Sequence, residues 1–497
     1  MTVWIYRGVA EPTGEGPLSG LSCAVKDNID VAGMPTTCGC PAFSYTPAVD
    51  AECVARLRAA GATVVGKTNM DQFATGLVGT RSPYGPVEAV TRPGRVGGGS
   101  SSGSAAAVAL GEVDFALGTD TAGSGRVPAV FQGIVGAKPS VGRVPTAGVV
   151  PACRSFDCVS VFARTVELAE RVLEVIGDPP QGPAGAPPEP RVVRFEDLDQ
   201  EPFLAAGELL YEGAFLSERY AAVGEFIESH LEECEPTVAS IILRGRRFSA
   251  ADYLRDRERL AELRVAALRQ LEGYDALIAP TVPFHPTLEE VAADPVGVNA
   301  RLGRYTTFVN LLGLCAYTLP SGESVLAPGG HDRVAADIAR ELAGESERRV
   351  EDDTFPGVPL SGGGPASPPP GTVALLAVGE HMSGLALNGE LVECGATLLG
   401  PARTAAAYRL FVLDGDPPRP GLVRDGAGSI AGELWAVPHC GLGKLVAALR
   451  QPIGLGRVDL ADGQQVVGFL CEPAALKDAR EITDLGGWRA YLASTKA

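Results

Sequence analysis

The sequence predicts an α/β protein with a central mixed β-sheet covered by helices, followed by a small β-rich α+β domain. Three observations support this. Helical and strand patterns alternate from Val25 to Val150, a Pro/Gly-rich stretch separates two regions, and short strands dominate after Thr372. A chain of 497 residues is also too long for one ordinary domain.

The first region begins with alternating elements. In "AECVARLRAAGATVVGKTN", Val54 and Leu57 lie one turn apart on a predicted helix that stops near Gly61, and Ala62–Val65 follows as a buried strand. The letters of Gly61–Thr68 match a phosphate-binding P-loop. A P-loop is followed directly by a helix, whereas here the predicted helix precedes the matching residues. We therefore reject a nucleotide-binding site at this position.

Residues 203–272 are predicted to be helical, and Tyr274–Pro283 contains a short buried strand. The Pro-rich stretch Asp178–Arg191 precedes helical sequence and is interpreted as a surface loop. A second stretch, Phe355–Thr372, follows a charged helix and precedes strands. We therefore expect a first domain at 1–350, a linker at 351–372 and a second domain at 373–497.

The second domain has the pattern of a β-rich fold. Segments such as "TVALLAVG", "YRLFVLDG" and "SIAGELWAVP" predict strands, and Asp462–Gly463 predicts a hairpin turn. Only residues 441–451 and 486–494 have helical patterns.

Composition excludes several function classes. A net charge of -18 argues against nucleic-acid binding, which needs clustered Lys and Arg. No apolar run approaches the roughly 20 residues of a membrane span, and the N-terminus lacks a signal-peptide pattern. The 11 cysteines are scattered without CxxC spacing, which indicates buried thiols in a reducing compartment. We expect a cytoplasmic protein without a metal or other cofactor.

One segment, "GGGSSSGSAAAVA" (Gly97–Ala109), looks like a flexible linker but continues into structured sequence. A small-residue helix (Ala105–Leu110), a buried strand (Phe115–Leu117) and a second turn, "TAGSGR", follow. Small residues at both turns let backbone amides converge on one point, as an oxyanion hole requires. A serine there can act as a nucleophile if a base lies nearby.

The chain has only five histidines, and none neighbours these serines. Lys26, inside the apolar-flanked "CAVKDN", can serve as the base if burial lowers its pKa and leaves it neutral. A salt-bridged lysine and two ordinary turns are the structural alternative. The combination of Lys26, Ser100 and Ser124 favours catalysis.

With these residues the sequence resembles the amidase signature enzymes, from Leu18 to about Gly344. The family's Ser–cis-Ser–Lys triad acts on amides, so the resemblance implies Ser124 as nucleophile, Ser100 as the bridging serine after a cis peptide bond, and Lys26 as base. Lys67 is interpreted as structural support. The resemblance also implies an oxyanion hole built from the backbone amides of Thr121, Ala122, Gly123 and Ser124.

The segments "KDNIDVAGMPTT", "DPVGVNARLGRYTTFVNLL" and "GEHMSGLALNGEL" resemble the allophanate hydrolases within that family, and general amidases lack the β-rich tail. The resemblance implies hydrolysis of the terminal amide of allophanate to release ammonia, with carbon dioxide released by the second domain. It further implies a homodimer, and two sources of allophanate stay open, a urea carboxylase coupled to this protein or the ring-opening of triazines. The alternatives are an amidase acting on another small amide, or an inactive shortened relative with a scaffold role.

Tyr211 and Arg219 are eight residues apart in the predicted helical segment, which places them roughly on one helical face. Spacing alone favours an exposed arginine and a core tyrosine, whereas the resemblance implies that both hold substrate, with Arg219 suited to a carboxylate. His381 follows a strand and precedes a Gly turn. It suits proton transfer in the second domain, with a loop-capping histidine as the alternative.

The chain is shorter than the family pattern near its N-terminus, around residues 179–191, and after Ser324. We expect these differences to affect stability, oligomer contacts or pocket access, through an exposed sheet edge for example, rather than the triad.

Overall fold

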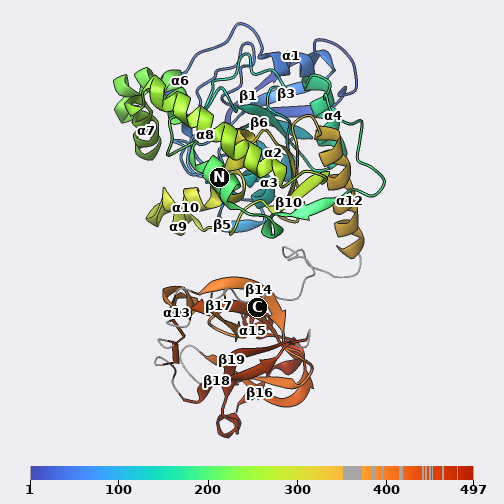
Figure 1. Cartoon of the computed structure of the whole chain (residues 1–497), viewed down its shortest axis with the longest axis vertical. Helices are drawn as coiled ribbons and strands as arrows, with labels where there is room; N and C mark the ends of the chain where they lie inside the picture. Colours follow the sequence, from blue (N-terminus) through green and yellow to red (C-terminus); the bar gives the residue numbers. More distant parts are fainter. Residues whose placement is uncertain are drawn as a thin grey trace. The chain divides into compact units, whose positions relative to one another are not determined.

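The computed structural model divides the chain into two compact units, Met1–Val358 and Pro359–Ala497 (Figure 1). It describes residues 2–350, 372–382, 385, 387–394, 396–413, 418–438, 441–442, 445–446, 449, 451–461, 464–477 and 479–495. The predicted linker at 351–372 lies outside the described residues, apart from Thr372.

The first unit is built on a ten-stranded mixed sheet, which confirms the predicted α/β class. Its strand order is β1-β3-β2-β6-β8-β7-β11-β12-β10-β9. β2 is parallel to both β3 and β6, and β9 is parallel to β10, whereas the other pairs are antiparallel. The strands are β1 Trp4–Ala10, β2 Ser22–Lys26, β3 Thr63–Thr68, β6 Phe115–Asp120, β7 Val135–Lys138, β8 Cys158–Ala163, β9 Val192–Arg194, β10 Ala276–Pro280, β11 Cys315–Thr318 and β12 Glu323–Ala327.

Helices cover both faces because side chains alternate along each strand. Cys23 and Val25 of β2 enter one core cluster with α1, α4 and α12, whereas Ala24 enters another with α2. α8 crosses the front of this unit in Figure 1. The helices are α1 Glu52–Ala59, α2 Ser102–Ala109, α3 Val127–Gln132, α4 Val166–Ile176, α5 Glu201–Glu208, α6 Leu216–Ser229, α7 Pro236–Leu243, α8 Ala250–Arg269, α9 Leu288–Ala293, α10 Gly297–Leu302, α11 Thr307–Leu311 and α12 Asp332–Val350.

Several local predictions are confirmed. Helix α1 ends before Gly61, which has a φ of +98°, and most of the rejected P-loop match forms strand β3. The segment after Thr318 forms a hairpin in which β12 lies between β11 and β10, so β12 is not an edge strand of the sheet.

The prediction of continuous helix around Tyr211 was wrong. A turn at residues 209–215 separates α5 from α6, so Tyr211 lies in that turn and Arg219 in α6. The turn packs against α8, where the Asp256 carboxylate accepts the Ala214 amide at 2.5 Å. A side chain at position 213 would meet the Leu209 carbonyl, so Gly213 permits this close approach.

The second unit is β-rich, as predicted. One sheet has the order β14-β17-β13-β19-β18 and another β16-β15-β20, around a core that includes Trp488 and Tyr408. At the predicted hairpin, β18 and β19 pair antiparallel, with Asp459 opposite Gln465 at the end nearest the turn. The predicted turn residues Asp462 and Gly463 lie outside the described residues. Sequence reasoning missed α13 and β16. The elements are β13 Thr372–Ala377, α13 Asn388–Glu393, β14 Thr397–Arg403, β15 Tyr408–Leu413, β16 Arg419–Gly428, β17 Ala431–Pro438, β18 Ile453–Asp459, β19 Gln465–Cys471, β20 Arg480–Glu481 and α15 Trp488–Ser494.

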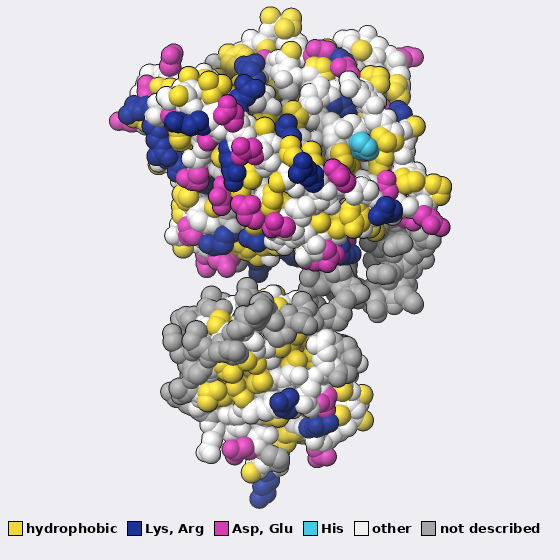
Figure 2. Space-filling view, viewed as in Figure 1, with side chains coloured by type: hydrophobic (Ala, Val, Ile, Leu, Met, Phe, Trp, Pro, Cys, Tyr) yellow, Lys and Arg dark blue, Asp and Glu magenta, His cyan; other side chains and the backbone are white. Residues whose placement is uncertain are grey.

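Acidic and basic side chains are interspersed on the face of the first unit shown in Figure 2. Within the described ranges, no helix is both long and apolar enough to cross a membrane. Ten cysteines fall in those ranges; all are free thiols, and nine are buried.

Candidate active site

Lys26 ends strand β2 with its side chain fully buried. Its Nζ lies 2.7 Å from Ser100 Oγ and 2.7 Å from Thr119 Oγ1. Burial lowers the pKa of Lys26 from 10.5 to about 7, although the negative charges of Asp71 and Asp120 act in the opposite direction. A large fraction of Lys26 is therefore the neutral amine near neutral pH, as a general base requires.

Ser100 lies in the Gly/Ser run, which forms a buried turn rather than a linker. The peptide bond between Gly99 and Ser100 is cis. The Ser100 carbonyl accepts the Asp71 amide at 3.0 Å, and the Asp71 carboxylate accepts the amides of Gly79 and Arg81 at 3.0 and 2.9 Å. A Cβ at position 99 would collide with that carboxylate, so only glycine fits there.

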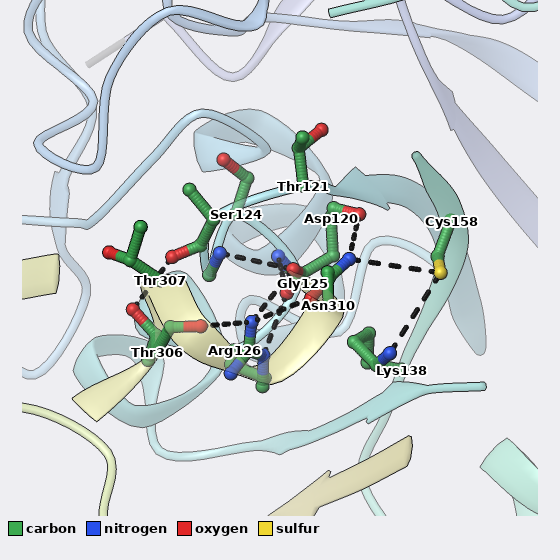
Figure 3. A network of polar contacts seen from close by, with 12 residues as sticks. Asp120, Thr121, Ser124, Gly125, Arg126, Lys138, Cys158, Thr306, Thr307 and Asn310 are labelled. Atoms are coloured by element: carbon green, nitrogen blue, oxygen red, sulfur yellow. Dashed lines mark hydrogen bonds and ion pairs between the residues drawn. The ribbon is translucent and has the colours of Figure 1, made fainter. Parts of the chain in front are cut away.

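Ser124 sits in the turn between β6 and α3, where a buried Asp120–Arg126 pair organises the backbone (Figure 3). Asp120 accepts the amides of Gly123 and Gly125 at 3.0 and 2.9 Å and two guanidinium N–H groups of Arg126, each at 2.9 Å. Bidentate pairing of this kind fixes the geometry of both side chains.

Sequence reasoning missed this support around Asp120. Asn310 Nδ2 donates to the Asp120 carbonyl at 2.8 Å, and Arg126 Nη2 donates to the Thr306 carbonyl at 3.0 Å. Thr306 Oγ1 in turn donates to the Ala122 carbonyl at 2.7 Å. The available signal was two opposite charges flanking a Gly-rich turn within apolar sequence.

The proposed oxyanion-hole amides are not equivalent. The Gly123 amide is engaged by Asp120, whereas the amides of Thr121, Ala122 and Ser124 donate to no acceptor among the described residues. Ser124 Oγ faces the Gly76 carbonyl at 3.4 Å and makes no hydrogen bond to Ser100 within the described ranges. Catalytic contacts of this kind often form only when substrate is bound.

Arg219 and Tyr211 are brought together, with the guanidinium 5.7 Å from the tyrosine ring centre. Arg219 is 2% exposed, so it is not the exposed arginine of the structural alternative. Its Nη1 donates to the carbonyls of Phe73 and Ala74, both at 3.2 Å, and to Thr75 Oγ1 at 2.8 Å. Arg219 thereby holds the segment that leads to Gly76, opposite Ser124.

His381 belongs to the second unit and lies in the turn after β13. Its Nε2 is 3.0 Å from a carboxylate oxygen of Glu390, and its ring stacks on Phe469 with centroids 4.4 Å apart. Burial lowers the pKa of His381, which favours the neutral imidazole. Nowhere in the described ranges do three or more His, Cys, Asp or Glu side chains form a group able to hold a metal ion.

Family models match both units: an amidase model covers residues 8–202, and an allophanate hydrolase C-terminal domain model covers residues 373–493. The Kluyveromyces lactis allophanate hydrolase structure is 35% identical, with a TM-score of 0.63, over 96% of this chain and 89% of that one. A glutamyl-tRNA(Gln) amidotransferase subunit from Symbiobacterium thermophilum is 36% identical, over 64% of this chain and 79% of that protein.

A Lachancea kluyveri urea amidolyase is 39% identical over 96% of this chain, but the match spans only 30% of that relative's length. The fold and these matches define an amidohydrolase with an amidase domain. More narrowly, because the resemblance extends through both units, the chain belongs to the allophanate hydrolase family.

Proposed function

We propose that this chain hydrolyses the terminal amide of allophanate (urea-1-carboxylate), with Ser124 as nucleophile, Ser100 as relay and Lys26 as base. The observation that carries the proposal is the buried Lys26 amine 2.7 Å from Ser100 Oγ, with a pKa lowered to about 7. A neutral amine in hydrogen-bond contact with a serine can accept its proton.

In this mechanism Lys26 takes the Ser100 proton while Ser100 takes the Ser124 proton. Ser124 Oγ then attacks the terminal carbonyl carbon of allophanate, and amides of the 121–124 turn stabilise the oxyanion. The C–N bond breaks as the proton is delivered to nitrogen, and ammonia leaves. Water then attacks the acyl ester, which releases N-carboxycarbamate and restores the Ser124 hydroxyl.

Selectivity for allophanate would come from Arg219 and Tyr211. The resemblance assigns them to the substrate carboxylate, and the contact between buried Arg219 and half-buried Tyr211, beside the segment opposite Ser124, supports that role. An amidase acting on another small amide would use the same Lys26 and Ser124 chemistry. The scaffold alternative is disfavoured because Lys26 and Ser100 are in contact.

The second unit would act on N-carboxycarbamate and release carbon dioxide and ammonia, with neutral His381 as the proton-transferring group. Replacing His381 with Gln should leave the first ammonia intact and slow carbon dioxide release. The proposal places this second step in a domain at 373–497, which a linker at 351–372 joins to the amidase domain at 1–350. Coupling to urea carboxylase, a homodimer and a cytoplasmic location are further parts of the proposal.

The test is ammonia release from allophanate, malonamate and simple amides by the full chain, by Ser124→Ala, and by the control Ser229→Ala in the last turn of α6. We expect preference for allophanate and loss of activity only in Ser124→Ala. Equal turnover of malonamate and simple amides would favour the general amidase. Failure of Ser124 to react with a serine-directed phosphonate would favour the scaffold.

A further inference from the structure

A cavity of about 1050 Å³ lies in the first unit, and neither Lys26, Ser100 nor Ser124 lines it. One wall is a face of α8, the helix that crosses the front of this unit in Figure 1. The loops at residues 140–143 and 329–332 also contribute walls. The cavity is therefore distinct from the proposed catalytic site.

The α8 wall is a continuous helical face. Tyr253, Arg257, Leu260, Ala261 and Arg264 all line the cavity, and their spacing of three or four residues places them on one side of the helix. Arg257 and Arg264 are seven residues apart, which is roughly 10 Å along the axis at 1.5 Å per residue. Apolar Leu260 and Ala261 lie between these two arginines along the same face of α8.

The charges in this cavity are not balanced. Its two acidic lining residues are already paired, Asp178 with Arg56 at 3.0 Å and Asp332 with Arg143 at 3.1 Å. By contrast, neither Arg257 nor Arg264 has an ion-pair partner in the part of the chain that the structure describes. Two positive charges on the α8 wall are left uncompensated.

Arg264 is held by one hydrogen bond to the backbone, and its guanidinium has further N–H groups that can donate. Its Nη2 donates to the Leu311 carbonyl at 2.5 Å, whereas its Nε is buried and has no hydrogen-bond partner among the described residues. Burial also lowers the pKa of this guanidinium, which shows that its charge is partly desolvated. An anion bound in the cavity would compensate this charge.

We propose that this cavity binds a small organic molecule with two anionic groups joined by a short apolar stretch, held between Arg257 and Arg264. Arg257 is exposed and would capture one group, while half-buried Arg264 would hold the other. Leu260 and Ala261 would contact the apolar stretch. Forked guanidinium donors match carboxylate or phosphate oxygens.

The test is isothermal titration of the full chain with adipate, inorganic phosphate and uncharged 1,6-hexanediol. We expect saturable binding of one adipate per chain, at least tenfold weaker phosphate binding, and no binding of hexanediol. Equal affinity for phosphate would overturn the assignment of two anionic groups. Absence of saturable adipate binding would overturn the site itself.

Variants on α8 locate the site. Arg257→Glu and Arg264→Gln should each weaken adipate binding at least tenfold, whereas Arg259→Glu, an exposed charge reversal outside this cavity, should not. Since Arg257 is exposed, its variant tests the proposal even if Arg264→Gln folds poorly. Loss of binding in Arg219→Gln, with no effect of Arg257→Glu, would place adipate in the catalytic site and contradict the proposal.

Discussion

Two neighbouring strands, β2 and β3, each carry a completely buried lysine, and the two side chains lie in different environments. Lys26 contacts the hydroxyl groups of Ser100 and Thr119. Lys67 lies 3.4 Å from the buried carboxylate of Asp27 and donates to Thr36 Oγ1 at 2.9 Å. The two lysines therefore share nearly the same burial and position in the sheet, but they differ in the groups that contact them.

The difference shows that burial alone does not define a catalytic base. Burial lowers the pKa of both lysines, and the charge of Asp27 opposes this for Lys67 at contact distance. Around Lys26, carboxylates raise the pKa without forming an ion pair with the amine among the described residues, while a hydroxyl group is positioned to give up a proton. The first environment suits proton transfer, and the second suits structural support.

Replacing Lys26 with Met should produce the largest effect on activity. Removing a general base costs roughly 10²- to 10⁴-fold in rate, so ammonia release should fall by at least about 100-fold. Thermal unfolding should change little because Met fills the space without bringing a charge into the core. Steady-state kinetics beside a melting curve would measure both. Retention of more than a tenth of the wild-type rate would exclude Lys26 as the base.

Replacing Lys67 with Met should show the opposite pattern. Asp27 would be left as an unpaired buried charge, and breaking a buried pair in this way costs about 3–5 kcal/mol of unfolding free energy. Chemical denaturation measures this loss, and adding Asp27→Asn should recover most of it. A folded Lys67→Met protein without activity would instead assign Lys67 to the chemistry.

The pH dependence should follow Lys26. With a pKa of about 7, activity should rise about tenfold per pH unit below 7 and level off above it. Stability should change in the same direction: between pH 7 and 10.5 the unfolded chain binds a proton that the folded chain does not, so stability rises with pH. Initial rates from pH 5 to 9 test the first statement. A flat profile would contradict the assignment.

Much of this site was predictable because its motifs are local. Lys26 lies between apolar residues at a strand end, and the serines lie in Gly-rich turns where only small residues allow close backbone contact. The α/β class followed from alternating patterns in the same way. The roles of Ser100 and Ser124 follow from the family resemblance, and the Ser124→Ala and Ser100→Ala variants test them.

The parts that sequence could not supply depend on contacts between distant residues. Asn310 and Asp120 are 190 positions apart, and no local pattern connects them. The turn at residues 209–215 packs against α8, where Asp256 accepts the Ala214 amide from 42 positions away. Helical propensity over residues 203–272 predicted the helices α5 to α8 correctly, but it did not locate the turn at residues 209–215 between α5 and α6.

Replacing Thr119 with Val should give the smallest effect and the sharpest test of the relay. Losing one hydrogen bond costs about 0.5–1.5 kcal/mol, or roughly 2- to 12-fold in rate. The matched control is Thr68→Val, which removes the buried hydroxyl bond to Ser104 at 2.7 Å and should leave kcat unchanged. Ser100 and Thr119 are equally close to Lys26, so distance does not identify the relay. If Ser100 is the relay, the kcat of Ser100→Ala should fall far below the kcat of Thr119→Val. The reverse order would assign the proton relay to Thr119.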